Sequence, residues 1–449
     1  MHKKLLTTAL LVILPFFVTA CSLKELPVIG KFFGGTPAIN KSGTINVWGL
    51  WEDVEVMDVL INKYKEKNPN ASIVYDNRSI QKSDQYRDTL YTRLTQEDTA
   101  GSDVGDVVLV HESWVPKMKE YLSPAPAFFM DTKTYASSFY PPAAENAVLD
   151  GKIYASPVYY DGLALVYNKK HFKEIDQETP PTAWEEFRRL ALKLTQKDKD
   201  GNLIRGGAAI GTSKNIDFFS DIVGLLLAQA GVSVPSGLDT EDARDALTFY
   251  TNFVNEDGVW NETMPEASTA FAQEKVSMIF IPSWNLLDII RVRPDLEIGV
   301  APVPQAVPEN PVSWASFWMY AVPEKSKNKE AAWDFIKFLS TEEAQLLMFS
   351  TASQYRTYGA PYSLAILRDQ ASSGSAAQYI KPYLDTAPFS KGSVFAARAG
   401  NTNTVNALKD AISLAINPDK DKRIPVSEIL KSLKEKFGGS IPSGTGSGN

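Results

Sequence analysis

The stretch Asp150-Gly-Lys-Ile-Tyr-Ala-Ser-Pro157, followed by Leu163-Ala-Leu-Val-Tyr167, decides the fold of this chain. Residues 152–157 and 163–167 each have the length and apolar content of a short strand. The break between them, Val158-Tyr-Tyr-Asp-Gly162, is too short to hold a helix and carries two adjacent tyrosines. The sequence therefore predicts two strands joined by a tyrosine-rich segment.

Strand-like and helix-like segments alternate on both sides of this stretch. A helical apolar stripe begins at Val54 and ends before Pro69, and other stripes run through 184–194, 243–254 and 332–339. The remaining predicted strands are 44–48, 72–76, 106–110, 276–281, 297–300 and 317–322. This alternation is typical of an α/β architecture.

The helix expected from Trp184 onward has a start signal of its own. Thr182 and Glu185 are spaced as a capping box, in which each side chain bonds the backbone N–H of the other residue. The sequence therefore predicts a reciprocal cap between Thr182 and Glu185.

The two ends of the chain are expected to lie outside the folded body. Residues 1–20 combine Lys3 and Lys4 with an apolar run that is shorter than the roughly 20 residues of a membrane span, as in a secretory signal peptide. Val-Thr-Ala-Cys21 closes this run and resembles the lipobox of bacterial lipoproteins, in which the cysteine thiol carries the lipid. We expect residues 21–43 to be a linker anchored by lipid on Cys21, and residues 438–449 to be a disordered Gly/Ser-rich tail.

Composition excludes some classes of function. Cys21 is the only cysteine, so the body is expected to hold no disulfide, and its stability must come from the core. The formal net charge of −7 and the lack of a basic stripe argue against a nucleic-acid partner. We expect a monomer without a cofactor or a resident metal.

Six motifs in order resemble the maltose-type family of extracellular solute-binding proteins, the receptors of carbohydrate ABC importers. The most similar is the quoted stretch, which extends to the "Tyr-Asn-Lys" motif ending at Lys169. The other five are 45–48, 106–108, 181–186, 271–284 and 331–336. The chain departs from the family pattern at Gly105, where a proline is usual, at Glu274, where a glycine is usual, and by one residue inserted before Trp184.

The resemblance, which covers roughly 44–437, implies a two-lobed periplasmic-binding-protein-like fold with discontinuous lobes, a hinge and ligand-dependent closure. We expect 44–160 and 319–355 to form the N-terminal lobe, and 161–318 and 356–437 to form the C-terminal lobe. Bending is expected near 159–163 and 320–322. The implied function is to capture a mono- or oligosaccharide and deliver it to the permease of an ABC importer. The implied location is the outer face of the cytoplasmic membrane.

Sugar binding needs flat aromatic faces for the C–H groups of the ring, and carboxylates or amides for the hydroxyls. Residues of these types stand at the expected strand ends and crossovers, and several also match ligand-contacting positions of the family. The candidates are Trp51, Glu52, His111, Glu112, Tyr159, Tyr160, Asp161, Trp284, Trp314, Trp318, Tyr355 and Arg356. Helix capping by Glu52, a structural role for His111, hinge packing by the two tyrosines and core packing by Trp314 or Trp318 are alternatives for individual members.

Two other functions use the same residues. Tyr159 and Tyr160, together with Asp161 or His111, could ligate ferric iron, a hard cation. Glu52, Glu112 and Asp161 could supply the carboxylate pair of a lipid-anchored glycosidase. The chain contains no Gly-x-Ser-x-Gly, His-Glu-x-x-His or phosphate-loop motif, so the sequence favours a binding protein over an enzyme.

Overall fold

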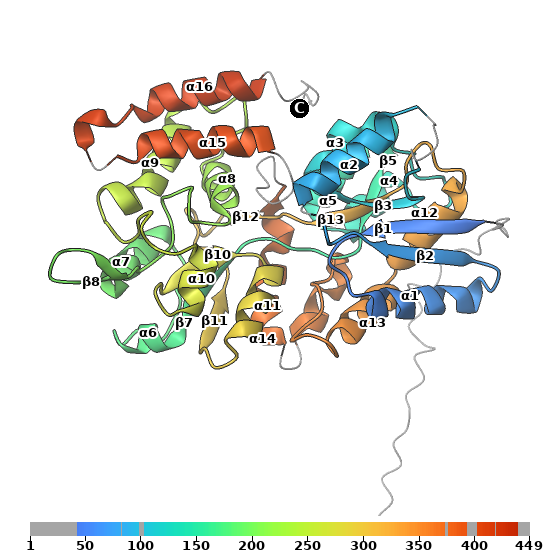
Figure 1. The fold of residues 1–449 in the computed structure, drawn as a ribbon, viewed down its shortest axis with the longest axis horizontal. Coiled ribbons are helices and arrows are strands. Elements are labelled where there is room, and N and C mark those ends of the chain that lie inside the picture. The colour runs from blue at the N-terminus through green and yellow to red at the C-terminus, as the bar shows by residue number, and fades with distance from the viewer. Residues whose placement is uncertain are drawn as a thin grey trace, which may run out of the picture. The chain divides into compact units, whose positions relative to one another are not determined.

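The computed structural model describes residues 43–81, 83–97, 103–372, 376–392, 402–417 and 419–438. The predicted signal peptide, Cys21, the linker before residue 43 and the tail from 439 lie outside the described residues. The described part of the chain builds two hydrophobic cores, each around its own sheet. Figure 1 shows the two lobes, with strands covered by helices in each. No described helix is both long and apolar enough to cross a membrane.

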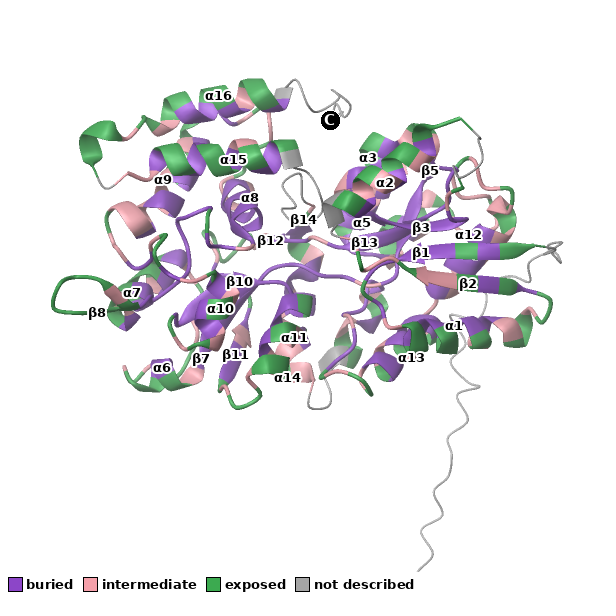
Figure 2. Ribbon diagram, in the orientation of Figure 1, coloured by how far each residue is buried: buried purple, intermediate pink, exposed green. Residues whose placement is uncertain are grey.

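The first lobe is built on a five-stranded mixed sheet. Its order is β2 (Ser72–Asn77), β1 (Thr44–Gly49), β3 (Val107–His111), β13 (Trp318–Ala321) and β6 (Ala155–Pro157). The first three strands are parallel, whereas β13 runs antiparallel to both of its neighbours. Since β3, β6 and β13 are buried along their whole length, their apolar residues fix the centre of this core (Figure 2).

Helices whose apolar faces pack on that sheet complete the first core. They are α1 (Val54–Lys67), α2 (Ser83–Thr95), α3 (Val115–Met118), α4 (Thr132–Ser138), α5 (Pro141–Ala147), α12 (Lys329–Leu339) and α13 (Glu342–Ala352). A small hairpin of β4 (Val148–Leu149) and β5 (Lys152–Ile153) precedes β6. In α1, the residues Val56, Met57, Leu60, Ile61 and Tyr64 are buried, which confirms the helical stripe predicted there.

The second lobe contains a three-stranded antiparallel sheet with β7 (Ala164–Asn168) between β10 (Met278–Ile281) and β11 (Ile298–Ala301). A separate hairpin pairs β8 (Gln196–Lys197) with β9 (Leu203–Arg205). Its helices are α6 (Lys169–Lys173), α7 (Trp184–Leu194), α8 (Phe219–Gln229), α9 (Glu241–Asn255), α10 (Ala267–Ala272), α11 (Ser283–Val292), α15 (Thr402–Ala415) and α16 (Val426–Gly438). The predicted α/β fold and its two lobes are confirmed.

The predicted capping box at the start of α7 is wrong. The N-cap residue is Ala183, which has no side-chain acceptor, and α7 begins one residue later than the pattern requires. It is Glu186, and not Glu185, that accepts from the backbone N–H of Thr182, at 3.3 Å. The residue inserted before Trp184 moves the helix start by one position, so the reciprocal pair cannot form.

Three chain crossings meet between the lobes as one hydrogen-bonded ribbon. Gly162 and Ala315 form an antiparallel bridge, flanked by bonds from Leu163 N to Trp314 O (3.0 Å) and from Ser316 N to the carbonyl of Asp161 (3.1 Å). Next to them, β12 (Ser313–Trp314) pairs in parallel with β14 (Ser390–Lys391). The second crossing therefore lies at 314–317. The expected bending segment 320–322 is misplaced, because Tyr320 and Ala321 are buried within β13.

The packing also differs from the expected lobe boundary after residue 355. Tyr358, Tyr362, Leu364, Ile380 and Leu384 pack in the first core and not in the second. The helix α14 (Ala377–Thr386) lies in this stretch and also contacts β11 of the second lobe. The local sequence pattern does not predict this packing, because it depends on contacts with residues that are distant in the sequence.

Candidate ligand-binding site

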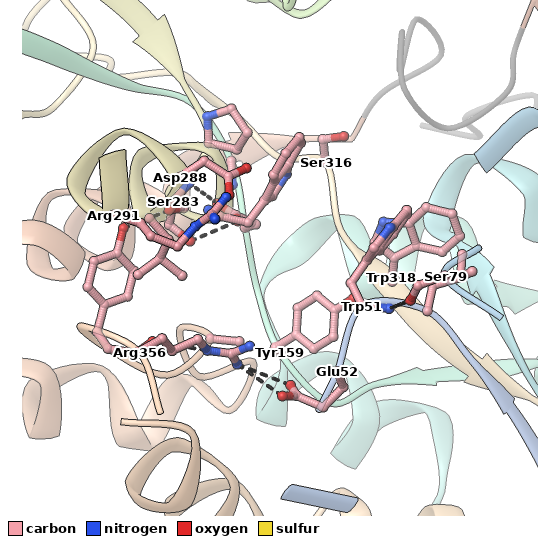
Figure 3. Close-up of a pocket in the computed structure, with 18 of the residues that line it drawn as sticks. Trp51, Glu52, Ser79, Tyr159, Ser283, Asp288, Arg291, Ser316, Trp318 and Arg356 are labelled. Atoms are coloured by element: carbon pink, nitrogen blue, oxygen red, sulfur yellow. Dashed lines mark hydrogen bonds and ion pairs between the residues drawn. The ribbon is translucent and has the colours of Figure 1, made fainter. Parts of the chain in front are cut away.

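A cleft of about 1430 Å³ is lined by residues of both lobes and of the crossings between them. Its walls come from the loops after β1 and β2, from the last residue of β3, from α11, from the loop after α13 and from α15. In Figure 3, Ser283, Asp288 and Arg291 lie on one side of the cleft and Trp51, Ser79 and Trp318 on the other. Clefts of this kind, largely apolar with a few polar groups, are where binding proteins hold small molecules.

Trp51 forms the aromatic wall of the first lobe. It follows β1 with φ +60°, a left-handed conformation that is uncommon for a side chain of this size, and its N–H donates to Ser79 Oγ. Its ring packs edge-on against Trp318, at 5.0 Å between centroids, and Trp318 in turn packs edge-on against Trp114 at 5.0 Å. Trp51 is still 47% exposed and lines the cleft, so part of the side chain is accessible to a ligand.

His111 lies behind this wall, at the end of β3. Its Nδ1 lies 2.8 Å from Ser113 Oγ, and its Nε2 lies 3.1 Å from Ser316 Oγ on the second crossing. Burial lowers the pKa of His111 to about 3, so the imidazole is neutral at physiological pH. His111 lines the cleft and also holds the first lobe to the crossing.

Glu52 and Arg356 form an ion pair on the cleft wall. One Arg356 Nη lies 3.1 Å and 3.2 Å from the two carboxylate oxygens of Glu52, and the other lies 3.7 Å from Asp53 Oδ2 (Figure 3). Burial raises the pKa of Glu52, and the charge of Arg356 and its hydrogen bond oppose that rise. The pair therefore offers acceptor and donor groups side by side, as adjacent sugar hydroxyls require.

The helix α11 supplies the wall of the second lobe. Trp284, Asp288 and Arg291 are spaced i, i+4 and i+7, which places all three on the helix face that lines the cleft. Trp284 is 41% exposed and packs edge-on against Phe218, at 5.7 Å between centroids. Arg291 pairs with Asp288 at 3.0 Å.

Asp161 lies in the first crossing and caps α11. The N-cap residue of that helix is Pro282, whose side chain offers no cap. The Asp161 carboxylate instead accepts from the N–H of Ser283 (2.9 Å), the hydroxyl of Ser283 (2.8 Å), the N–H of Trp284 (3.3 Å) and the N–H of Gly162 (2.8 Å). Burial nevertheless raises the pKa of Asp161 to about 6. The carboxylate lines the cleft, but four donors already surround it.

Two tyrosines complete the set of predicted residues that reach the cleft. Tyr159 lies in its floor, and burial together with the charges of Glu52 and Asp161 raises the pKa of its hydroxyl well above its ordinary value. Tyr355 is 59% exposed on the loop after α13. The structure thus brings Trp51, Glu52, His111, Tyr159, Asp161, Trp284, Trp318, Tyr355 and Arg356 to one cleft.

Three predicted site residues do not line the cleft. Glu112 is fully buried and accepts from Asn146 Nδ2 at 2.6 Å. Tyr160 packs edge-on against Tyr140 in the first core, whereas its neighbour Tyr159 lines the cleft. Trp314 is buried in the second core, where its Nε1 donates to Asp221 at 3.0 Å. For Tyr160 and Trp314 the packing alternatives therefore agree with the structure, whereas the burial of Glu112 was not expected.

Sequence reasoning missed several cleft residues. They are Ser79, Phe218, Asp221, Ser283, Asp288, Arg291 and Ser316, among others. The spacing of Asp288 and Arg291 from Trp284 could have identified those two, once residues 283–292 were expected to be helical. Ser79, Phe218 and Ser316 carry no such signal, since only the tertiary fold brings their loops together.

Comparisons with known proteins agree with this geometry. The family model described as bacterial extracellular solute-binding protein matches residues 49–346. The multiple sugar-binding protein of Streptococcus mutans is 23% identical over 368 residues, which cover 74% of this chain and 84% of that protein. A putative binding protein of Brucella abortus is 25% identical over 258 residues, and the chain spans 62% of its length.

Solved structures show the same fold. A maltose-bound binding protein of T. maritima has a TM-score of 0.65 at 17% identity, covering 89% of this chain and 100% of that one. A Mycobacterium tuberculosis protein in complex with glycerophosphocholine has a TM-score of 0.66 at 17% identity, covering 89% of this chain and 100% of that one. The family match covers most of the folded body and the fold agrees over nearly all of it: the chain belongs to the bacterial extracellular solute-binding protein family.

Proposed function

We propose that this protein captures a sugar in the cleft between its lobes and delivers it to an ABC importer. One observation carries the proposal. Trp51 and Trp284, one from each lobe, both line the same cleft and are 47% and 41% exposed. Aromatic faces pack on the C–H faces of sugar rings, and a ligand that contacts both lobes stabilises their closure.

The polar groups of the cleft suit a polyhydroxylated ligand. Glu52 and Arg356 present an acceptor beside a donor, and Asp288 and Arg291 do the same on α11. The Streptococcus mutans relative is named as a multiple sugar-binding protein, which supports the same cargo class. The Mycobacterium neighbour holds glycerophosphocholine, so that compound belongs in the test panel.

The two rival functions have less support. Tyr159 lines the cleft, whereas Tyr160 is buried in the first core, so the two hydroxyls do not both face the cleft as a shared ferric ion would require. Within the described residues, no group of three or more His, Cys, Asp or Glu side chains is placed to hold a metal. Of the three carboxylates considered for a glycosidase, Glu112 lies outside the cleft and Asp161 is engaged by α11.

Attachment to the membrane through lipid on Cys21 is part of the proposal. The motif Val-Thr-Ala-Cys21 after an apolar run supports it. Exchange of Cys21 for Ser should move the chain from the membrane fraction to the soluble fraction of cells. Persistence of the variant in the membrane fraction would contradict lipid anchoring.

The deciding experiment is thermal unfolding against a panel of mono- and oligosaccharides, glycerophosphocholine and ferric citrate. A ligand that binds only the folded state stabilises it by about 2.7 kcal/mol at 100 times its Kd. We expect one sugar class to raise Tm. Trp51→Ala and Trp284→Ala should each weaken binding about tenfold, or 1.4 kcal/mol. Trp333→Phe, in the first core, is the control and should leave affinity unchanged. A Tm shift with ferric citrate alone, or with no sugar, would contradict the proposal.

A further inference from the structure

The junction between β10 and α11, immediately before Trp284, is fixed from outside its own lobe. The hydroxyl of Tyr358 donates to the carbonyl of Ser283 at 2.6 Å, and the hydroxyl of Tyr383 on α14 donates to the carbonyl of Ile281 at 3.1 Å. Asp161 binds the N–H groups at the same junction. Because Tyr358 belongs to the first core, its hydrogen bond ties the cleft-facing tryptophan of the second lobe to the first lobe.

The backbone of Tyr358 is tied to the opposite side of the cleft. Arg356 Nε donates to the carbonyl of Tyr358 at 3.2 Å, while one Nη of the same guanidinium contacts both carboxylate oxygens of Glu52. Three successive contacts therefore connect Glu52 with Ser283 through Arg356 and Tyr358. Figure 3 shows the first of these contacts, with Ser283 on the other side of the cleft.

The loop that carries these contacts is held in place by its neighbours. Gly359 N donates to Ser353 Oγ at 3.0 Å, and Ser353 Oγ donates to the carbonyl of Phe349 at 2.8 Å. A Cβ atom at Gly359 would lie 2.6 Å from Phe349 Cα, so the loop lies directly on α13. Tyr358 is fully buried, and burial raises the pKa of its hydroxyl well above the ordinary value, which keeps the donor protonated. A loop packed this closely moves as a unit and transmits displacement.

We propose that Tyr358 is a positioning residue that couples Glu52 on one side of the cleft to Trp284 on the other. A ligand hydroxyl that engages Glu52 changes its contact with Arg356, and the 353–359 loop passes that change to the first turn of α11. The two halves of the cleft thus respond to one ligand together. The inference deepens the proposed function and rests on it for the identity of that ligand.

The coupling can be measured without any ligand, by 19F NMR of the full chain labelled with 5-fluorotryptophan. Nine tryptophans give nine resonances, and that of Trp284 is the one lost in Trp284→Phe. Glu52→Gln perturbs the first contact while keeping the shape of the side chain. Tyr358→Phe removes only the hydroxyl, and Tyr383→Phe is the matched control, because it deletes a hydroxyl bond to the same junction but has no contact with Arg356.

We expect Glu52→Gln to shift the Trp284 resonance by more than its linewidth when it is introduced into the parent chain or into the Tyr383→Phe variant. In the Tyr358→Phe variant, the same exchange should leave the Trp284 resonance in place. Equal movement in all three backgrounds, or no movement in the parent, would overturn the inference. Circular dichroism melts of each variant check that it is folded.

Binding gives a second, independent readout once a sugar is identified. Tyr358→Phe should weaken affinity about fivefold, as expected for one buried hydrogen bond. Its effect should be non-additive with that of Glu52→Gln, whereas Tyr383→Phe should be additive with it. If no sugar binds, the proposed function fails while the 19F experiment still decides the coupling. If a sugar binds and the effects of Tyr358→Phe and Glu52→Gln add, the inference alone fails.

Discussion

Asp161 shows how one residue can match a family's ligand position and yet serve the fold. Its carboxylate replaces the side-chain cap that Pro282 cannot provide, and it accepts two of the N–H groups that the first turn of α11 leaves without helical partners. The resemblance implied a sugar contact at Asp161, and that contact remains a prediction. The four hydrogen bonds already in place indicate a structural contribution as well.

Asp161→Ala should lower the free energy of unfolding by about 2–3 kcal/mol, because buried N–H groups would lose their acceptor. Asp53→Ala is the control, since Asp53 is the N-cap residue of α1, makes no side-chain capping bond and is half-exposed. That exchange should cost less than about 0.5 kcal/mol. Urea unfolding at pH 7 measures both. A variant at position 161 that unfolds like the parent but no longer binds sugar would show that Asp161 is purely a ligand residue.

His111 makes stability depend on pH in a defined direction. Its pKa in the folded state is about 3, whereas an unfolded histidine has a pKa near 6.5. The unfolded state therefore binds more protons as the pH falls below about 6.5, and stability is lost progressively from there toward pH 3. Burial also lowers the pKa of His171, to about 4, which acts in the same direction.

We expect His111→Gln to reduce the loss of unfolding free energy between pH 7 and pH 5 by about 2 kcal/mol. Asp161 acts in the opposite direction, since its raised pKa of about 6 favours the folded state at low pH. The informative quantity is therefore the difference between variant and parent at each pH, measured by urea unfolding. An unchanged pH dependence in His111→Gln would show that the imidazole takes up a proton as readily in the folded protein as in the unfolded one.

At the scale of elements, the ribbon of crossings depends on a glycine. A Cβ atom at Gly162 would lie 2.4 Å from the carbonyl oxygen of Trp314, well inside contact distance. The first and second crossings approach this closely because their backbones are directly hydrogen-bonded to each other. Only glycine fits here without separating the two chain segments.

Gly162→Ala should destabilise the protein by about 2–3 kcal/mol, since the clash is with backbone that cannot move away. The comparison variant is Gly151→Ala in the β4–β5 hairpin, where φ is +73° and no atom lies near the new Cβ. There the cost is that of backbone conformation alone, about 1 kcal/mol. Thermal and urea unfolding compare the two. Equal effects would mean that the ribbon relaxes to accept a side chain.

At the scale of the whole molecule, the proposed function predicts that the lobes close around a ligand that contacts both of them. Small-angle X-ray scattering should show a smaller radius of gyration at saturating sugar for the parent protein. Trp284→Ala at saturating sugar should show less of this compaction, because the ligand then loses an aromatic contact with the second lobe while Trp51 still holds it on the first. Full compaction of that variant would show that Trp284 takes no part in closure.

The sequence by itself determined the elements and their kind. Strand and helix patterns depend on residues a few positions apart, so the apolar stripes of α1, α7, α9 and α12 and the buried strands could be predicted from local periodicity. Family resemblance added the two lobes, and the expected strand ends and crossovers, together with that resemblance, identified most of the cleft aromatics. The prediction from local spacing was wrong for the cap of α7, because one inserted residue moves the helix start so that Ala183 is the N-cap residue.

Only the tertiary structure decided which side chains meet. Glu112, Tyr160 and Trp314 stand at the same strand ends and crossings as residues that line the cleft, but their side chains are buried. Tyr160 and Trp314 pack in the two cores, and Glu112 accepts a hydrogen bond from Asn146. Residues such as Tyr358, Leu364 and Ile380 return to the first core, and Glu52 pairs with Arg356, which lies 304 positions further along the chain. No local pattern encodes such contacts, because they form only when hydrophobic burial brings distant segments together.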